Sequence, residues 1–350
     1  MRTVSISFLL LLVLAGCSPF SGTRYADIPA EQYNYIKGQR VTPEEIGIRI
    51  VADGNAKRIS WPLNISGDEN VTLPLRLQGG AITTPVEVNG TARVPAVIDT
   101  GAPFNVASLA LAYSLDLPVT RSPMLPRQVG GYGGASAECG WSLLKTLQLG
   151  NLLFTNSLVM VPVERFERVT LFGQVTLNED QFVILGLDDM ARMSYVTFDF
   201  PQGRFILERN KPFIRQSGES NLNVSCQVIP AGMGPILLTW ITVDGKGPFP
   251  CRIDTGKTYQ APALTIPQQL AKELGYWKEE GGKRADRVGI GGSFETQRFT
   301  LKSFEIGSGR FDKLTADSHE GAKEFILGLA FLRQYRTTID FRLRMISLEK

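Results

Sequence analysis

Two short stretches of the sequence place an aspartate where acid–base chemistry is possible: Asp99-Thr100-Gly101 and Asp254-Thr255-Gly256. Each aspartate ends an apolar run and is followed by a tight turn, which predicts a buried or half-buried carboxylate. Threonine offers a hydroxyl that can fix the loop, and glycine lets a neighbouring backbone approach closely. A single copy would be ordinary turn chemistry, but two copies indicate a pair of acids.

Two carboxylates within hydrogen-bond distance of each other cannot both ionise, so they share one proton and their apparent pKa values separate. Such a pair can hold a water molecule, remove its proton as it attacks a carbonyl carbon, and protonate the other side of the bond. We therefore expect Asp99 and Asp254 to be the catalytic residues of a hydrolase.

The elements that must position these acids occur twice in the same order. A hairpin-turn signal, Asn89-Gly90 or Asp244-Gly245, begins ten residues before each aspartate. A glycine-dense segment, an Ile-Leu-Gly-Leu element and an Asp-Phe pair follow each aspartate. This order predicts an internal duplication whose pseudo-twofold axis brings the two loops face to face.

The chain of 350 residues is 43% hydrophobic, with 35 glycines and 20 prolines, which favours two domains built from short strands. We predict lobes at residues 69–212 and 213–350, after a tether and irregular segment at residues 17–68. The net charge is only +3 and the basic residues form no stripe, so nucleic acid is not an expected partner.

The N-terminus has the pattern of an export signal. Arg2 precedes an apolar run, Phe8 to Leu14, that is too short to span a bilayer. The run ends in Leu14-Ala15-Gly16-Cys17, which resembles the lipobox of bacterial lipoproteins. That resemblance implies removal of residues 1–16 as a signal peptide and lipidation of Cys17. With Ser18 next, it also implies anchoring at the outer membrane, facing the periplasm. An ordinary secretory signal with a chance cysteine is the alternative.

The other cysteines are Cys139, Cys226 and Cys251. Cys226 and Cys251 fall in neighbouring strand-like runs, so they are either bridged or buried as free thiols. The sequence has no paired-cysteine motif, and its one histidine, His319, is expected at the surface in a polar stretch. We therefore expect no metal and no other cofactor.

Most of residues 71–350 resembles the retropepsin family of aspartic proteases. Val97-Ile98-Asp99-Thr100-Gly101-Ala102 is similar to the active-site loop of that family, and Ile184-Leu185-Gly186 to the element beneath the loop. Because the pattern occurs twice, the chain resembles a fused retropepsin dimer of bacterial origin. The resemblance implies a mainly β, two-lobed acid-protease β-barrel fold with internal duplication and few short helices.

The resemblance also implies roles for individual residues. Asp99 and Asp254 would be the catalytic pair, and Thr100, Gly101, Thr255 and Gly256 would support their loops. Two glycine-rich flaps would close over a bound peptide as mobile lids. The flap residues would be Val129, Gly130, Gly131, Tyr132, Gly133 and Gly134 in the first half, and Val288, Gly289, Ile290, Gly291 and Gly292 in the second.

Lys257 departs from the family pattern, because Ser, Thr or Ala usually follows the second Asp-Thr-Gly. A cation close to Asp254 would lower the pKa of that carboxylate by about 1–3 units and disturb the shared proton. Alternatively, the flexible stem of Lys257 carries the ammonium out to solvent and leaves the pair intact.

Together these features predict a lipid-anchored periplasmic aspartic endopeptidase that acts on peptides or proteins as a two-lobed monomer. Lys257 motivates one alternative, a catalytically inactive relative that binds peptides or protein partners. A third possibility is that only the first lobe is competent and pairs with another chain.

Overall fold

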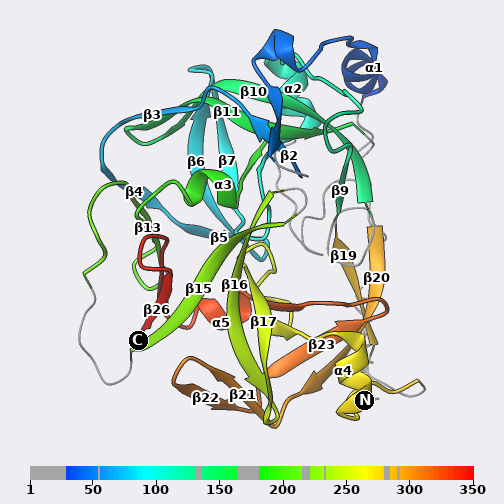
Figure 1. Cartoon of the computed structure of the whole chain (residues 1–350), viewed down its shortest axis with the longest axis vertical. Helices are drawn as coiled ribbons and strands as arrows, with labels where there is room; N and C mark the ends of the chain where they lie inside the picture. The colour runs from blue at the N-terminus through cyan, green and yellow to red at the C-terminus, as the bar shows by residue number, and fades with distance from the viewer. Residues whose placement is uncertain are drawn as a thin grey trace, which may run out of the picture.

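The computed structural model describes residues 29–53, 56–130, 136–163, 181–214, 221–231, 234–279, 284–289 and 292–350. The predicted signal peptide, Cys17 and six of the predicted flap residues lie outside this part: Gly131, Tyr132, Gly133, Gly134, Ile290 and Gly291. The described residues form a mainly β, two-lobed fold with few short helices, so the predicted fold class is confirmed (Figure 1).

Lobe 1 is a sheet whose strands, among the described residues, follow the order β3-β11-β8-β12-β7-β6-β10-β9, with β5 beside β6. Because β10 also pairs with β11, the sheet closes on itself as a barrel. Its strands are β3 (Asn64–Gly67), β5 (Arg76–Gln78), β6 (Ala81–Val88), β7 (Ala92–Ile98), β8 (Asn105–Ala107), β9 (Gln128–Gly130), β10 (Ser136–Leu149), β11 (Leu152–Pro162) and β12 (Val183–Leu185). Its helices are α2 (Leu109–Ser114) and α3 (Leu187–Met190).

Lobe 2 repeats this arrangement with β17, β18, β23 and β24 in the places of β7, β8, β11 and β12. Its strands are β16 (Gly234–Val243), β17 (Lys246–Asp254), β18 (Leu264–Thr265), β19 (Arg284–Gly289), β20 (Gly292–Thr300), β21 (Ser303–Ile306), β22 (Gly309–Asp312), β23 (Thr315–His319) and β24 (Phe325–Gly328). The helices α4 (Gln268–Glu273) and α5 (Leu329–Leu332) complete the lobe.

A shared sheet joins the lobes in the order β15-β26-β25-β13-β14-β4 (Figure 1). Its strands are β4 (Asn70–Pro74), β13 (Tyr195–Asp199), β14 (Arg204–Glu208), β15 (Leu222–Ala231), β25 (Arg336–Asp340) and β26 (Met345–Glu349). Each lobe contributes three strands, and the order is symmetric about the β13–β25 pair. At its centre the Thr197 and Thr338 hydroxyls form a hydrogen bond of 2.8 Å.

The segment before β4 is more ordered than the predicted irregular lead-in. It contains α1 (Ala30–Gly38), a 3-10 turn (Glu44–Ile46) and a hairpin of β1 (Arg49–Asp53) and β2 (Ala56–Ser60). Helix α1 packs on α2, and β3 pairs with β11. Ile36 and Ile48 are fully buried, so burial against lobe 1 stabilises a stretch whose apolar residues are too dispersed to show a period.

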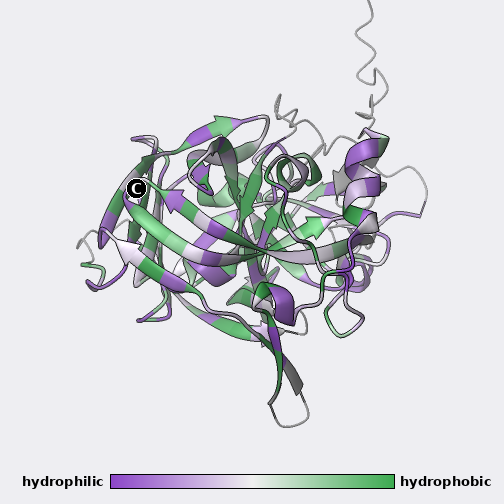
Figure 2. Ribbon diagram, turned by 90° about the horizontal axis from the view of Figure 1, so that it is seen from above, coloured by the Kyte–Doolittle hydropathy of each residue, from purple (hydrophilic) through white to green (hydrophobic). Residues whose placement is uncertain are grey.

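Most of the buried residues are apolar, and hydrophobic residues concentrate in the central strands (Figure 2). Cys139, Cys226 and Cys251 are buried free thiols, so no bridge joins Cys226 to Cys251. Strand β16 lies between them, because Thr239 pairs with Cys226 on one side and with Cys251 on the other. Two strand spacings amount to about 10 Å, beyond the reach of a disulfide.

Candidate active site

Strands β7 and β17 deliver the two Asp-Thr-Gly loops to the interface between the lobes. The hydroxyl of Thr100 donates to the carbonyl oxygen of Ile253 at 2.9 Å and accepts from the Thr255 N–H at 3.0 Å. The hydroxyl of Thr255 donates to the carbonyl oxygen of Ile98 at 2.9 Å and accepts from the Thr100 N–H at 2.9 Å. These four reciprocal hydrogen bonds hold the two loops face to face.

The glycine of each loop packs against the carboxylate of the other. A Cβ atom added to Gly101 would lie 2.4 Å from Cγ of Asp254. A Cβ atom added to Gly256 would lie 2.4 Å from Oδ1 of Asp99. Both positions therefore require glycine for close approach, and both aspartates lie at the pseudo-twofold axis.

Asp99 is buried, with 9% of its surface exposed. Its Oδ1 accepts hydrogen bonds from the Gly101 N–H at 2.7 Å and the Ala102 N–H at 3.1 Å. Burial, reinforced by the charge of Asp254, raises the pKa of Asp99 to about 7. The Gly101 N–H and Arg252 oppose this rise, and a hydrogen bond between the two carboxyls adds to it. The buried pair therefore binds a proton in mildly acidic solution.

Asp254 is slightly more accessible, with a side chain 13% exposed. Its Oδ1 accepts a hydrogen bond from the Lys257 N–H at 2.9 Å, and its Oδ2 lies 3.9 Å from Nη2 of Arg252. Asp254 therefore has a cation beside it in addition to one backbone N–H donor, whereas Asp99 accepts from two backbone N–H groups.

The ammonium of Lys257 points away from the aspartate pair. Its Nζ lies 2.9 Å from Oδ1 of Asp317 and donates a hydrogen bond to Thr265, inside lobe 2. The stem of Lys257 passes over Gly328, where an added Cβ would lie 2.7 Å from Cγ of Lys257. Of the two expected outcomes, the ammonium does leave the pair, but it enters a buried ion pair instead of solvent.

Arg252 is a residue of the site that the sequence motifs do not indicate. This residue lies two positions before Asp254, and its Nη2 donates a hydrogen bond to the carbonyl oxygen of Gly101 at 2.8 Å. Its Nη1 lies 3.2 Å from Oε1 of Glu324. The sequence does contain one sign of Arg252: it is a charged residue within the apolar run that precedes the second Asp-Thr-Gly.

An apolar wall extends from Asp99 on the lobe 1 side. Side chains alternate along a strand, so Val97 shares the face of Asp99 while Ile98 points into the main core. Val97 pairs with Ile184, and both belong to an apolar cluster that also contains Ile48 and has Trp61 packed against it. This apolar cluster therefore begins beside the candidate catalytic carboxylate.

The predicted flaps fall on two hairpins. Val129 and Gly130 lie on β9, which pairs with β10. Val288 and Gly289 lie on β19 and Gly292 begins β20, with Gly289 opposite Gly292. Figure 1 shows β9, β19 and β20 on the same side of the molecule.

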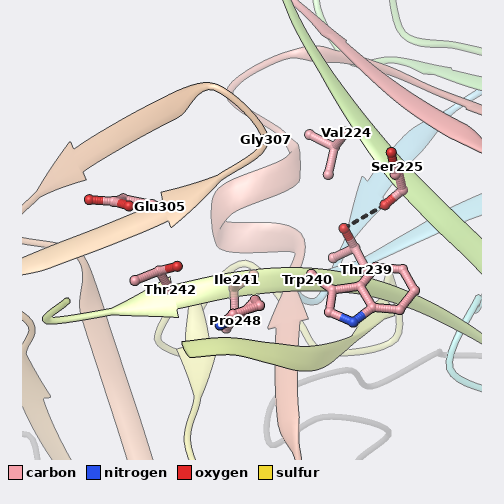
Figure 3. Close-up of a pocket in the computed structure, with 9 residues that line it drawn as sticks. All are labelled: Val224, Ser225, Thr239, Trp240, Ile241, Thr242, Pro248, Glu305 and Gly307. Carbon is pink, nitrogen blue, oxygen red and sulfur yellow. Dashed lines mark hydrogen bonds between the residues drawn. The ribbon is translucent and has the colours of Figure 1, made fainter. Parts of the chain in front are cut away.

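A hollow of about 290 Å³ lies on lobe 2, away from the aspartate pair (Figure 3). It is lined by Val224, Ser225, Thr239, Trp240, Ile241, Thr242, Pro248, Glu305 and Gly307. The Thr239 hydroxyl is directed to the Ser225 carbonyl oxygen at 2.8 Å, as the dashed line marks. Glu305 is the one ionisable residue among these nine, so the hollow has no acid–base pair of its own.

Within the described ranges, no group of histidine, cysteine and carboxylate side chains could hold a metal ion. His319 is buried, contrary to the surface position expected from its polar neighbours. Its ring packs on Phe294, and Nδ1 lies 2.9 Å from the carbonyl oxygen of Glu320. In the same part of the chain, no helix has the length and apolarity needed to cross a membrane.

Residues 84–188, which contain Asp99 and the Ile184-Leu185-Gly186 element, match the model of a family described as aspartyl protease. No curated protein matches the chain. The basic 7S globulin from soybean is similar at 12% identity and a TM-score of 0.45, over 82% of this chain and 95% of the globulin. A retropepsin-like aspartic protease from Rickettsia conorii is similar at 17% identity and a TM-score of 0.29, over 43% of this chain and 96% of the protease.

Proposed function

We propose that this protein is an aspartic endopeptidase in which Asp99 and Asp254 together hydrolyse peptide bonds. The observation that carries the proposal is the pair of Asp-Thr-Gly loops, locked face to face by the hydroxyls of Thr100 and Thr255. The match of residues 84–188 to an aspartyl protease family supports the same chemistry.

The two acids have different tasks in the proposed reaction. Asp254, beside Arg252, is the carboxylate that removes a proton from the attacking water. Asp99, whose pKa is raised to about 7 by burial and by Asp254, carries the proton that polarises the substrate carbonyl. Proton transfer through the pair then releases the amine, and no cofactor takes part.

An ammonium of Lys257 placed between the two acids would have favoured the inactive alternative. Instead, the ammonium is bonded to Asp317, so this support for the alternative is missing. The reading in which lobe 1 pairs with another chain has no support either, because this chain supplies both loops.

The catalytic proposal is tested with Asp99→Asn and Asp254→Asn. Each should lower the cleavage of a peptide library between pH 3 and 8 by about a thousandfold or more, because the residues of a catalytic unit act together. Asp188→Asn is the matched control, since this carboxylate is paired with Arg192 at 2.9 Å outside the site. Circular dichroism checks that each variant is folded. Full activity in either active-site variant would overturn the two-carboxylate mechanism.

We further propose that the enzyme is lipid-anchored at Cys17 and works in the periplasm, at the outer membrane, on peptide or protein substrates. The support is the Leu14-Ala15-Gly16-Cys17 motif. Cys17→Ser should move the protein from the membrane fraction to the soluble periplasmic fraction and abolish fatty-acid labelling. Unchanged labelling of that variant would contradict the assignment, and export without labelling of the wild type would favour an ordinary secretory signal.

A further inference from the structure

Arg252 breaks the pseudo-twofold symmetry at the aspartate pair. The pairing of β17 with β24 places Arg252 opposite Ile326, as the pairing of β7 with β12 places Val97 opposite Ile184. The same position is therefore a buried valine in lobe 1 and an arginine in lobe 2. Equivalent strands thus give one aspartate an apolar neighbour and the other a cationic one.

The guanidinium of Arg252 contacts both loops. Its Nη2 donates to the Gly101 carbonyl oxygen of the first loop at 2.8 Å and lies 3.9 Å from Oδ2 of Asp254 in the second. A planar guanidinium with several donors suits such a bridging position, whereas a single ammonium offers only a point charge. The contact fixes the distance between the loops on one side of the axis and places positive charge on the Asp254 side.

Few other charges bear on the pair in the described part of the chain. Glu324, which precedes β24, lies 3.2 Å from Arg252, but its side chain is 52% exposed and is well screened by solvent. Lys257 on the second loop is bound to Asp317 of β23. Asp99 has the charges of Asp254 and Arg252 acting on it, in opposite directions. Arg252 is thus the cation with a direct bearing on how the pair divides its charge.

We propose that Arg252 is a positioning residue of the site, which ties the two loops together and keeps the negative charge of the pair on Asp254, so that Asp99 carries the proton. This inference deepens the proposed function and rests on it. It assigns a fixed direction to the pair, with Asp254 as the base and Asp99 as the acid, although the two loops have the same sequence motif. It also extends activity to lower pH, because a cation beside the pair favours its singly ionised form.

The test compares Arg252→Met, Arg252→Lys and Glu324→Gln with the wild type. In Arg252→Met, we expect the acid limb of the pH–rate profile to move up by about 1 pH unit, an amount reduced by the partial solvent exposure of Arg252. Arg252→Lys restores the charge and should return the limb to within about 0.3 units of the wild type, with a lower kcat where the bridge to Gly101 is lost. Glu324→Gln is the control and should shift the limb by less than about 0.3 units.

A second measurement does not depend on turnover. The carboxyl carbons of 13C-labelled aspartate are titrated by NMR and assigned with Asp99→Asn and Asp254→Asn. The first ionisation of the pair should occur about 1 unit higher in Arg252→Met than in the wild type. A titration unchanged by Arg252→Met, or shifted equally by Arg252→Lys, would overturn the role of Arg252. A wild type that titrates as expected but cleaves no peptide would overturn the proposed function and leave this role standing.

Discussion

The two lobes have matching Asp-Thr-Gly loops, but they bury different kinds of side chain at equivalent positions behind these loops. In lobe 2 the ammonium of Lys257 meets Thr265 and Asp317. The strand registers make Ala102, Val106 and Met160 the corresponding residues of lobe 1, and all three are apolar. An ion pair therefore occupies a place in lobe 2 that is ordinary hydrophobic packing in lobe 1.

Lobe 1 has its own buried polar network, which includes Asn105, the residue before Val106. The amide of Asn105 donates to Oδ2 of Asp189 at 2.6 Å and to the Ser157 hydroxyl at 2.8 Å, and its oxygen accepts from the Gly186 N–H at 2.7 Å. The corresponding residues of lobe 2 are Leu264, Leu314 and Phe331. The two loops thus have the same residues where they face each other, while each lobe has a different buried network behind its own loop.

The largest expected effect on stability comes from changing Lys257, which belongs to the buried network of lobe 2. Lys257→Met should destabilise the fold by about 3–5 kcal/mol, because the carboxylate of Asp317 keeps its hydrogen bond from Thr265 but loses its buried counter-charge. The combination Lys257→Met, Thr265→Val and Asp317→Leu gives lobe 2 the apolar chemistry of lobe 1, and should recover most of that loss. Urea unfolding measures both. If the triple variant is no more stable than Lys257→Met, apolar side chains cannot replace the ion pair of lobe 2. That result would contradict the equivalence that we infer between the two lobes.

The network of lobe 1 should make stability depend on pH through Asp189. Burial raises the pKa of Asp189 from 3.8 to about 6, against the hydrogen bonds from Asn105 and Ser157. A pKa raised in the folded state means that the proton binds the folded protein more tightly. The stability that protonated Asp189 contributes to the folded state is therefore complete below about pH 4 and is lost as the pH rises through about 6.

Asp189→Asn removes this titration and keeps an acceptor for Asn105 and Ser157. Relative to the variant, the wild type should lose about 2–3 kcal/mol of stability between pH 4 and 7, at about 1.4 kcal/mol per pKa unit. Unfolding free energies of both proteins at several pH values give the difference. A difference that stays constant with pH would show that Asp189 keeps its charge state, and the two networks would then be more alike than we infer.

The smallest effect concerns the symmetric part of the site. Thr100→Val and Thr255→Val each remove one buried donor and one buried acceptor between the loops, at a cost of about 2 kcal/mol. Since the two sets of hydrogen bonds are equivalent, the two costs should agree within about 0.5 kcal/mol in the same unfolding assay. Unequal costs would extend the divergence of the lobes to the loops themselves.

The sequence predicts the local and repeated features well. The duplicated Asp-Thr-Gly loops, the mainly β fold and the two halves follow from motifs whose residues are close in the chain. The contacts of Lys257 are of another kind, since Asp317 lies sixty positions away and only the pairing of β18 with β23 brings it close. A lysine beside an aspartate in sequence therefore gives no indication of which carboxylate it binds.

Strand order limited other predictions. Cys226 and Cys251 lie on β15 and β17, which are not neighbours because β16 pairs with both, and a pattern of alternating residues does not reveal which strand is in the middle. The N-terminal segment has few apolar residues, and the burial of Ile36 and Ile48 depends on a surface that lobe 1 supplies. Arg252 has a charged side chain within an apolar run, and only its contact with Gly101 shows what that charge does.

The shared sheet also sets the order in which the molecule can fold. In lobe 1 the first strand of the shared sheet, β4, pairs with the last, β14, and in lobe 2 β15 pairs with β26. Each lobe is thus a loop of more than a hundred residues whose ends must meet before it is complete. The chain emerges N-terminus first, with β14 well before β26, so lobe 1 can close while lobe 2 is still incomplete. The half that carries Asp99 then offers the open edge of β13 as a template, and the half that carries Asp254 is built onto it.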